Sequence, residues 1–213
     1  SGEHAGRPFL LRDWQKDIIR GIYDPVQPDG RRRVRTALLT MGRKNGKTQL
    51  AAGLALAHLI GPEREQRGQI YSAAADRAQA AIIYNEAKAM LEADPELLAL
   101  VNIIDSTKRI VHYATGSFFQ ALSSDSKSKH GFSASVIIYD ELAQAPNREL
   151  YDVLTTSTAA RREPLTLVIS TQSSNPNHIM SELVSYGRQV RDGVIEDPTF
   201  APFIFAAPMD ACL

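Results

Sequence analysis

The sequence predicts an α/β fold in which helices cover a mostly parallel sheet. Three observations support this prediction. Short apolar runs alternate along the chain with longer segments of helical periodicity. A Gly-Lys-Thr triplet stands between the first apolar run and the first longer segment, as it does in phosphate-binding loops. Another apolar run ends in two acidic residues, at the place where open α/β sheets bind ligands.

The elements can be placed in order along the chain. We expect strands at 35–40, 68–75, 135–141, 165–170 and 203–207. We expect helices at 47–60, 76–91, 147–159 and 179–191, with Asp76 and Asn147 as N-caps of the second and third. The segment 109–122 alternates and turns at Thr115-Gly116, which predicts an antiparallel hairpin, and the polar segment 123–133 predicts a loop.

Composition places the chain among globular proteins. Its 213 residues suit one large domain, and 44% apolar residues can build a core. Basic and acidic residues balance at 24 each, so nucleic acid would have to be bound by a local patch or by an assembly. The longest apolar run, 51–60, is too short to cross a bilayer, and we expect no membrane partner. The single cysteine, Cys212, can form no internal disulfide, and the last residues suggest part of a longer protein.

The stretch TMGRKNGKTQ (40–49) departs from the usual phosphate-binding pattern. In G-x-x-x-x-G-K-[ST] the first glycine would stand at Met41, whereas Gly42 comes one position late. The second half is intact: Gly46 allows close backbone approach, Lys47 can reach the β- and γ-phosphates, and Thr48 can place its hydroxyl on Mg²⁺. The triplet also arises by chance, but its place between strand and helix favours phosphate binding. We therefore predict a nucleotide site that also includes Gly42, Arg43, Lys44, Asn45 and Gln49.

The stretch VIIYDEL (136–142) carries the acidic pair. Asp140 would hold Mg²⁺ directly or through water, and Glu141 could polarise a water for attack on the γ-phosphate. The alternative is an ordinary strand exit with two solvated acids. The loop upstream favours the functional interpretation, because both features are then expected at the same edge of the sheet.

Three further features have weaker interpretations. The hydroxyl of Thr171, in Ser170-Thr171-Gln172, could sense the γ-phosphate, or the segment could be a polar turn. Gln15 has the donor and acceptor needed to bind an adenine edge, whereas Trp14 is expected to anchor the core. The run Arg31-Arg32-Arg33-x-Arg35 is expected to be a solvated loop or, as a second possibility, a contact to DNA phosphates.

Together these segments resemble the ATPase domain of bacteriophage large terminase subunits, the motors that pump DNA into empty capsids. The resemblance extends from about Pro8 to the end of the chain. It is carried by F-x-L-x-x-W-Q at 9–15, GRKNGKT at 42–48, YSAAADRAQA at 71–80, DSKSKHGFSASVIIYDE at 125–141, and STQ at 170–172.

The resemblance implies a three-layer P-loop NTPase core of the additional-strand, catalytic-glutamate type. It implies one ATPase domain over 1–213, with an adenine-side segment at 1–33 and the core at 34–207. ATP and Mg²⁺ would be the cofactors, and Glu141, Arg43 and Lys47 the catalytic residues. Gln15 would contact adenine, Thr48 and Asp140 the metal, and Thr171 would belong to a coupling motif.

The resemblance also implies partners. These are double-stranded DNA, the portal protein, the small terminase subunit and further copies of the chain in a ring. The place of action would be the host bacterial cytoplasm, docked on the procapsid. Relatives carry a nuclease domain after the ATPase domain, and because this chain does not include one, we expect it not to cut DNA.

One departure from the family concerns a cation supplied to a neighbouring subunit. Many relatives have an arginine in the loop before the acidic strand, where this chain has only Lys127, Lys129 and His130. A lysine lacks the planar fork that binds a γ-phosphate through two hydrogen bonds. The role could therefore belong to Lys129 or to Arg109, Arg148 or Arg161.

Two rival functions stay open from sequence. A helicase-like ATPase fragment would show D-E-x-H or D-E-x-D, whereas Asp140-Glu141 is followed by Leu142 and Ala143. A P-loop enzyme acting on a small molecule would need its own acceptor pocket, which sequence does not exclude. A helicase would separate the strands of a duplex, which a DNA motor would not. Hydrolysis by an enzyme acting on a small molecule would not respond to DNA.

Overall fold

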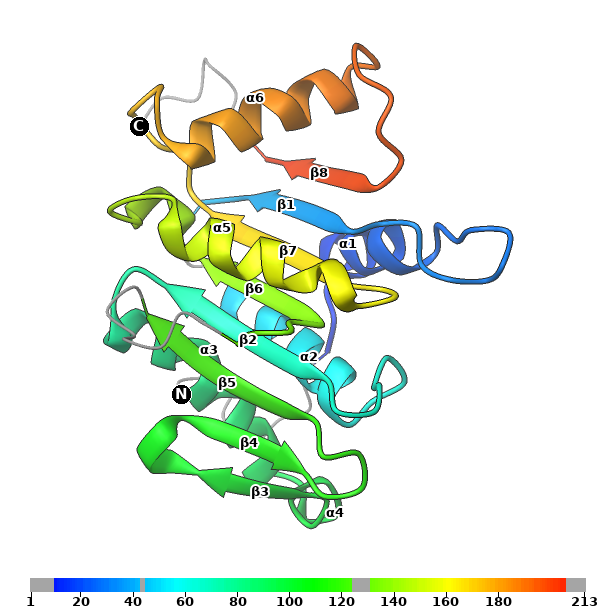
Figure 1. The fold of residues 1–213 in the computed structure, drawn as a ribbon, viewed down its shortest axis with the longest axis vertical. Coiled ribbons are helices and arrows are strands. Elements are labelled where there is room, and N and C mark those ends of the chain that lie inside the picture. The colour runs from blue at the N-terminus through cyan, green and yellow to red at the C-terminus, as the bar shows by residue number, and fades with distance from the viewer. Residues whose placement is uncertain (1–9, 43–44, 124–130, 206–213) are drawn as a thin grey trace.

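The computed structural model describes residues 10–42, 45–123 and 131–205. In this part of the chain an eight-stranded sheet has the order β3-β4-β5-β2-β6-β7-β1-β8 (Figure 1). The strands are β1 Thr36–Thr40, β2 Gln69–Ala74, β3 Val101–Ile104, β4 Arg109–His112, β5 Phe118–Ser123, β6 Val136–Asp140, β7 Leu165–Ser170 and β8 Phe200–Ile204. The α-helices are α1 Asp13–Tyr23, α2 Lys47–Leu59, α3 Arg77–Glu92, α4 Pro95–Leu98, α5 Glu149–Thr156 and α6 Ile179–Arg191.

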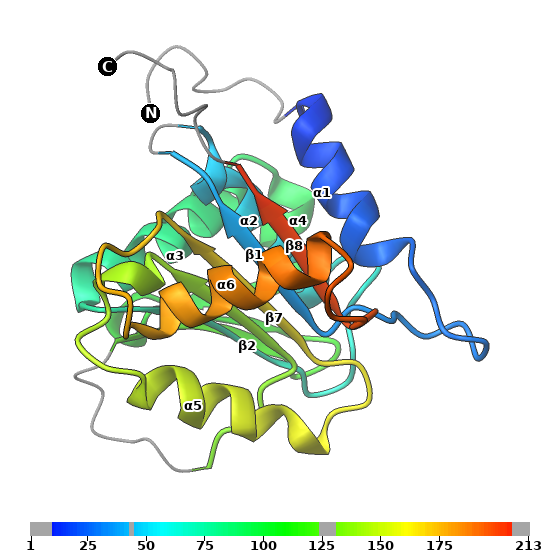
Figure 2. The same ribbon diagram turned by 90° about the horizontal axis from the view of Figure 1, so that it is seen from above.

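Helices cover both faces of the sheet, which gives the three layers that the family resemblance implied. Figure 2 shows α1, α2 and α3 on one face and α5 and α6 on the other. Two apolar clusters fill the spaces, one containing Leu50, Ile83 and Phe119, the other containing Tyr139, Leu154 and Met180. Because both faces are covered, the central strands β6 and β7 are buried along their whole length.

Strand order decides which groups meet at the carboxyl edge. β7 lies between β1, which leads into the phosphate loop, and β6, which carries the acidic pair, and all three run parallel. This is the additional strand expected from the family resemblance. Only β4 among the described strands runs against the others, in the predicted hairpin with β5.

Most predicted elements are confirmed, with a few differences. Asp76 accepts a hydrogen bond from the Gln79 backbone N–H and caps α3 as expected. The prediction of Asn147 as an N-cap was wrong. Arg148 is the N-cap of α5, and the Asn147 side chain accepts a hydrogen bond from the Glu149 N–H. Three elements were not predicted from the sequence: the amphipathic helix α1, the one-turn helix α4 and the four-residue edge strand β3.

The basic run before β1 does not form a solvated loop as a whole. Arg32 is buried, and its guanidinium donates to the backbone carbonyls of Val34, Glu163 and Pro164. The other arginines of the run are exposed or half-buried, and Arg31 pairs with Asp29. The interpretation of Arg32 as a solvated or DNA-contacting residue was therefore wrong.

Among the described helices, none is long and apolar enough to span a membrane.

Candidate nucleotide-binding site

Three neighbouring strand ends bring the predicted site residues together. Thr40 of β1 pairs in register with Ser170 of β7, and Asp140 of β6 pairs with Ile169 of β7. The phosphate loop leaves β1, the acidic pair leaves β6, and Thr171 leaves β7 at the same edge of the sheet (Figure 1). Two motifs that are far apart in sequence therefore form one site.

The phosphate loop is shaped by Gly46 at the start of α2. Gly46 has φ 75° and ψ 22°, a left-handed conformation that disfavours residues with a Cβ. It is the N-cap of a 13-residue helix, whose first backbone N–H groups point out of this end. Asn45 closes part of the loop, because its side-chain amide donates to the Gly42 carbonyl at 3.2 Å. Arg43 and Lys44 lie outside the described residues.

Lys47 joins the loop to the acidic pair. Its Nζ donates to the Met41 carbonyl at 2.9 Å and lies 3.6 Å from Glu141 Oε1. Both side chains are buried, at 9% and 11% exposure, so their attraction is only weakly screened by solvent. The buried Lys47 ammonium thus lies at the start of a helix and beside a carboxylate. A phosphate oxygen could replace the Met41 carbonyl as the acceptor of its hydrogen bond.

Glu141 is held in an unusual backbone conformation. Its φ of 50° and ψ of 49° lie in the left-handed region, which costs a non-glycine residue on the order of 1 kcal/mol. Its N–H donates to the Ile169 carbonyl at 2.7 Å, and its Oε2 accepts from Thr171 Oγ1 at 3.2 Å. The contact of Thr171 with the nucleotide stays a prediction, and in this structure its hydroxyl donates to Glu141. Ser170 supports the same turn, since its Oγ accepts the Ala143 N–H at 3.0 Å.

Asp140 lies at the end of β6 and is buried. Its Oδ2 accepts from Gln79 Nε2 at 2.7 Å. Burial raises the pKa of the Asp140 carboxyl, the Gln79 hydrogen bond opposes that rise, and the charge of Glu141 adds to it. Sequence reasoning missed Gln79, although its place in the first turn of α3, directly after the strand next to β6, could have suggested the contact.

Gln15, for which a contact with adenine was predicted, lies beside the phosphate loop, and its amide is engaged by backbone groups of the protein. Its Oε1 accepts the Arg12 N–H at 2.9 Å, and its Nε2 lies 3.5 Å from the Gly46 carbonyl. The side chain is 2% exposed. It therefore links α1 to the loop, while Trp14 is half-buried against the core, as expected.

The oxygen donors of Asp140 and Thr48 suit Mg²⁺. Magnesium prefers one or two carboxylates and keeps several waters, and the buried Asp140 carboxylate with the half-buried Thr48 hydroxyl provides such a donor set. Among the residues that the structure describes, no cluster of three His, Cys, Asp or Glu side chains could hold a metal ion by itself. The donors therefore fit an ion that is bound together with phosphates.

Four residues are candidates for the cation that reaches the nucleotide of a neighbouring subunit, and those that the structure describes differ in how firmly they are held. Arg161 is mostly buried, pairs with Glu65 at 2.8 Å and donates to the Ser133 carbonyl at 2.8 Å. Arg109 lies over the ring of Phe118 at 3.6 Å. Arg148 is exposed and pairs with Asp152 and Glu182. Lys129 lies outside the described residues.

Comparison with known proteins agrees with this geometry. The family model described as the ATPase domain of the terminase large subunit matches residues 13–189. The chain belongs to this family. The large terminase subunit of Enterobacteria phage HK97 is 38% identical over 214 residues, which cover 99% of this chain and 40% of that protein. This chain thus spans about two fifths of the length of that relative.

Solved structures agree with the family and with the predicted fold class. The crystal structure of the HK97 large terminase matches 99% of this chain and 42% of its own, with a TM-score of 0.86 and 37% identity. The ATPase domain of the large terminase of Thermus phage P74-26 shares the fold at 19% identity, with a TM-score of 0.68, over 92% of this chain and 80% of its own. A large terminase from a thermophilic bacteriophage, solved in complex with ADP, shares it at 12% identity, with a TM-score of 0.59, over 90% of this chain and 44% of its own.

Proposed function

We propose that this chain hydrolyses ATP with Mg²⁺ and that hydrolysis drives double-stranded DNA into a phage capsid. The observation that supports this best is the position of Lys47 between the phosphate loop and Glu141, with Asp140 beside them. Membership of the terminase ATPase family and the ADP complex of the relative from a thermophilic phage support the choice of nucleotide.

The proposed chemistry assigns a task to each group. Lys47 and the N–H groups at the start of α2 bind the β- and γ-phosphates. Glu141 orients the attacking water and accepts its proton, while Thr171 holds the Glu141 carboxylate in place. Thr48 and Asp140 would hold Mg²⁺, which neutralises charge on the phosphate oxygens when bound. Arg43 would add a cation from the same loop.

The contact between Thr171 and Glu141 suggests how hydrolysis is coupled to movement. Thr171 begins the connection from β7 towards α6, so a shift of Glu141 on loss of the γ-phosphate would pull on that connection. We propose a ring of copies on the portal protein, with the small terminase subunit and DNA, in the host bacterial cytoplasm at the procapsid. A cation from the neighbouring copy would complete the site.

Hydrolysis in the presence and absence of DNA tests this function. ATP turnover by the chain should require Mg²⁺, and in the full-length protein with portal it should rise on addition of double-stranded DNA. Turnover that ignores DNA in that complete system would favour an enzyme acting on a small molecule. Separation of a forked duplex would favour the helicase alternative.

A further inference from the structure

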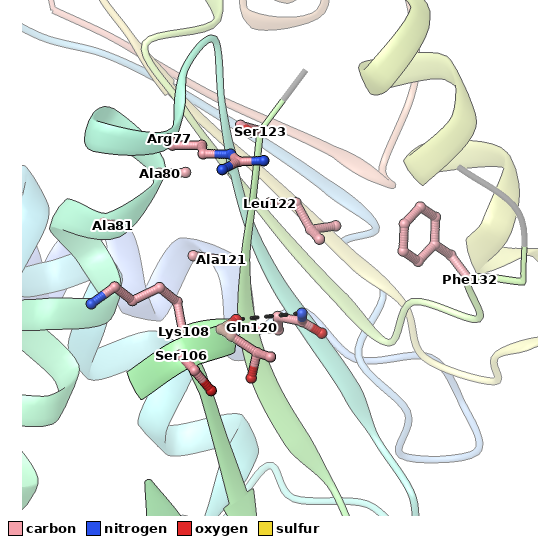
Figure 3. Close-up of a pocket in the computed structure, with 11 residues that line it drawn as sticks. Arg77, Ala80, Ala81, Ser106, Lys108, Gln120, Ala121, Leu122, Ser123 and Phe132 are labelled. Carbon is pink, nitrogen blue, oxygen red and sulfur yellow. Dashed lines mark hydrogen bonds between the residues drawn. The ribbon is translucent and has the colours of Figure 1, made fainter. Parts of the chain in front are cut away.

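A cavity of about 660 Å³ opens beside the end of β5, two strands away from the acidic strand β6 (Figure 3). α3, the turn between β3 and β4, and the end of β5 form its walls. Leu122 and Phe132 give it apolar surface, and Gln120 and Ser106 add polar groups. Arg77 and Lys108 are its cations, and none of the described residues that line it is acidic.

Lys108 is kept at the cavity by a strained backbone. Its φ of 50° lies in the left-handed region, where a glycine or asparagine would be less costly. The Ala121 N–H donates to the Lys108 carbonyl at 3.1 Å, and the Lys108 N–H donates to the Asp105 carbonyl at 3.3 Å. Asp105 is in turn fixed by Tyr84 at 3.0 Å and Lys88 at 2.6 Å. The turn is thus held firmly at the cavity wall, and the Lys108 Nζ lies 5.3 Å from the centre of the Tyr84 ring.

Arg77 approaches the cavity from the first turn of α3. Its side chain is exposed, and no ion pair of Arg77 occurs within the described part of the chain. Figure 3 shows its guanidinium near the end of β5, by Ser123. Two residues further on, Gln79 of the same turn contacts Asp140. The turn therefore reaches from the cavity to the nucleotide site.

We propose that this cavity binds the phosphodiester backbone of DNA. Cations, an amide and hydroxyl groups suit phosphate oxygens, and the alanine, leucine and phenylalanine surface suits deoxyribose. This proposal deepens the proposed function, on which it rests, by naming residues that contact the substrate. Movement of α3 on DNA binding would reach Asp140 through Gln79.

Salt-dependent DNA binding tests the proposal. The double variant Arg77→Ala/Lys108→Ala should bind a fluorescent duplex of about 30 base pairs on the order of tenfold more weakly than the unchanged chain at low salt. The slope of log affinity against log salt should fall by roughly two, because two phosphate contacts are lost. Arg162→Ala/Arg188→Ala removes the same charge from positions elsewhere on the surface and should change both quantities little.

Several results would overturn the proposal. The first is undetectable DNA binding by the unchanged chain. The second is a cavity variant that binds DNA as tightly as the unchanged chain, and the third is a control variant that loses as much affinity as the cavity variant. A change in self-association with unchanged DNA affinity would assign the cavity to a protein contact instead. Thermal unfolding establishes that each variant is folded. ATP turnover without DNA is recorded separately, since its absence in the unchanged chain counts against the proposed function rather than against the cavity.

A separate observation leads to a second proposal: we infer that Gln79 is a positioning residue for Asp140. The rotation of a carboxylate about its last torsion is soft, so a hydrogen bond at 2.7 Å to Oδ2 fixes which oxygen faces the phosphate loop. Gln79 is itself fixed, because its backbone N–H donates to the Asp76 cap at 2.9 Å. A metal held by Asp140 would therefore depend on this amide.

The test replaces the amide while keeping the size of the side chain. Gln79→Met should require about tenfold more Mg²⁺ to reach half of the thermal stabilisation given by ADP, and the Mg²⁺ dependence of turnover should move in parallel. Gln189→Met on α6 is the matched control and should leave both curves in place. Unchanged Mg²⁺ dependence in Gln79→Met would overturn the role. Absence of any Mg²⁺ effect in the unchanged chain would instead count against the proposed function.

Discussion

Both ends of the parallel strands bury charged side chains, but the two ends bind them differently. At the carboxyl end most partners are side chains: Lys47 pairs with Glu141, Gln79 donates to Asp140 and Thr171 donates to Glu141, while Lys47 also donates to the Met41 carbonyl. At the amino end Arg32 donates to three backbone carbonyls, and His58 bonds to the Tyr23 hydroxyl at 2.8 Å.

This difference separates a reactive site from a structural one. Backbone carbonyls buried at the amino end depend on Arg32, because a buried acceptor without a donor is costly. Side-chain partners at the carboxyl end can turn towards a ligand. We therefore expect substitutions at the carboxyl end to reduce turnover more than stability, and substitutions at the amino end to do the reverse.

The largest effect should come from Glu141→Gln. Turnover should fall at least about 100-fold, since the amide cannot accept the proton of the attacking water. ATP binding should persist and the free energy of unfolding should change by less than about 1 kcal/mol, because the amide keeps the size and the Thr171 contact. Steady-state hydrolysis and binding of a fluorescent ATP analogue measure these quantities. Turnover close to that of the unchanged chain would remove Glu141 from this role.

The counterpart at the amino end is Arg32→Met. We expect a loss of about 2 kcal/mol in the free energy of unfolding, because buried carbonyls lose their donors, while turnover of the folded variant stays close to that of the unchanged chain. Urea unfolding measures the loss. Arg33→Met, which affects an exposed residue, is the control and should cost less than about 0.5 kcal/mol. Equal costs for the two variants would contradict the structural role of Arg32.

The pH dependence of stability should report His58. Burial lowers the pKa of the His58 imidazole from 6.5 to about 3, so between these two values the unfolded chain binds a proton that the folded chain does not. Stability should therefore be complete above the unfolded pKa and fall as the pH is lowered, by up to about 1.4 kcal/mol per pH unit. His58→Asn should flatten this slope in unfolding curves measured across the range. A slope that the substitution leaves unchanged would show that His58 is not its source.

The smallest effect concerns the hydrogen bond between Tyr23 and His58. Tyr23→Phe should lower the free energy of unfolding by about 1 kcal/mol, the usual contribution of a buried hydrogen bond. Tyr113→Phe removes a hydroxyl from a side chain that is 65% exposed and should cost close to nothing. Equal melting temperatures of the two variants would contradict this contribution.

The sequence predicted the carboxyl end better than the amino end, and the reason is physical. Gly46, Lys47 and Asp140 stand at fixed offsets from a strand and a helix, so the periodicity that predicts those elements also places the residues. Arg32 belongs to a run of arginines that suggests exposure, and only tertiary contacts with Pro164 and Glu163 show that one of them is buried.

Contacts between distant segments were the part that sequence could not provide. The bond from Gln79 to Asp140 joins residues 61 positions apart and depends on β2 lying next to β6. The left-handed backbone of Glu141 has no local signal, because neighbouring strands and not the residue type impose it. The edge strand β3 was missed because four residues are too few for a clear alternation.

ATP binding and turnover by Lys47→Ala test the proposed nucleotide site most directly. If the carboxyl end is the nucleotide site, loss of this buried ammonium should abolish turnover or weaken ATP binding on the order of 100-fold or more, while the fold is retained. Hydrolysis and nucleotide binding measured on the same folded sample decide the outcome. Normal binding together with normal turnover would show that Lys47 and the carboxyl end of the sheet do not form the nucleotide site.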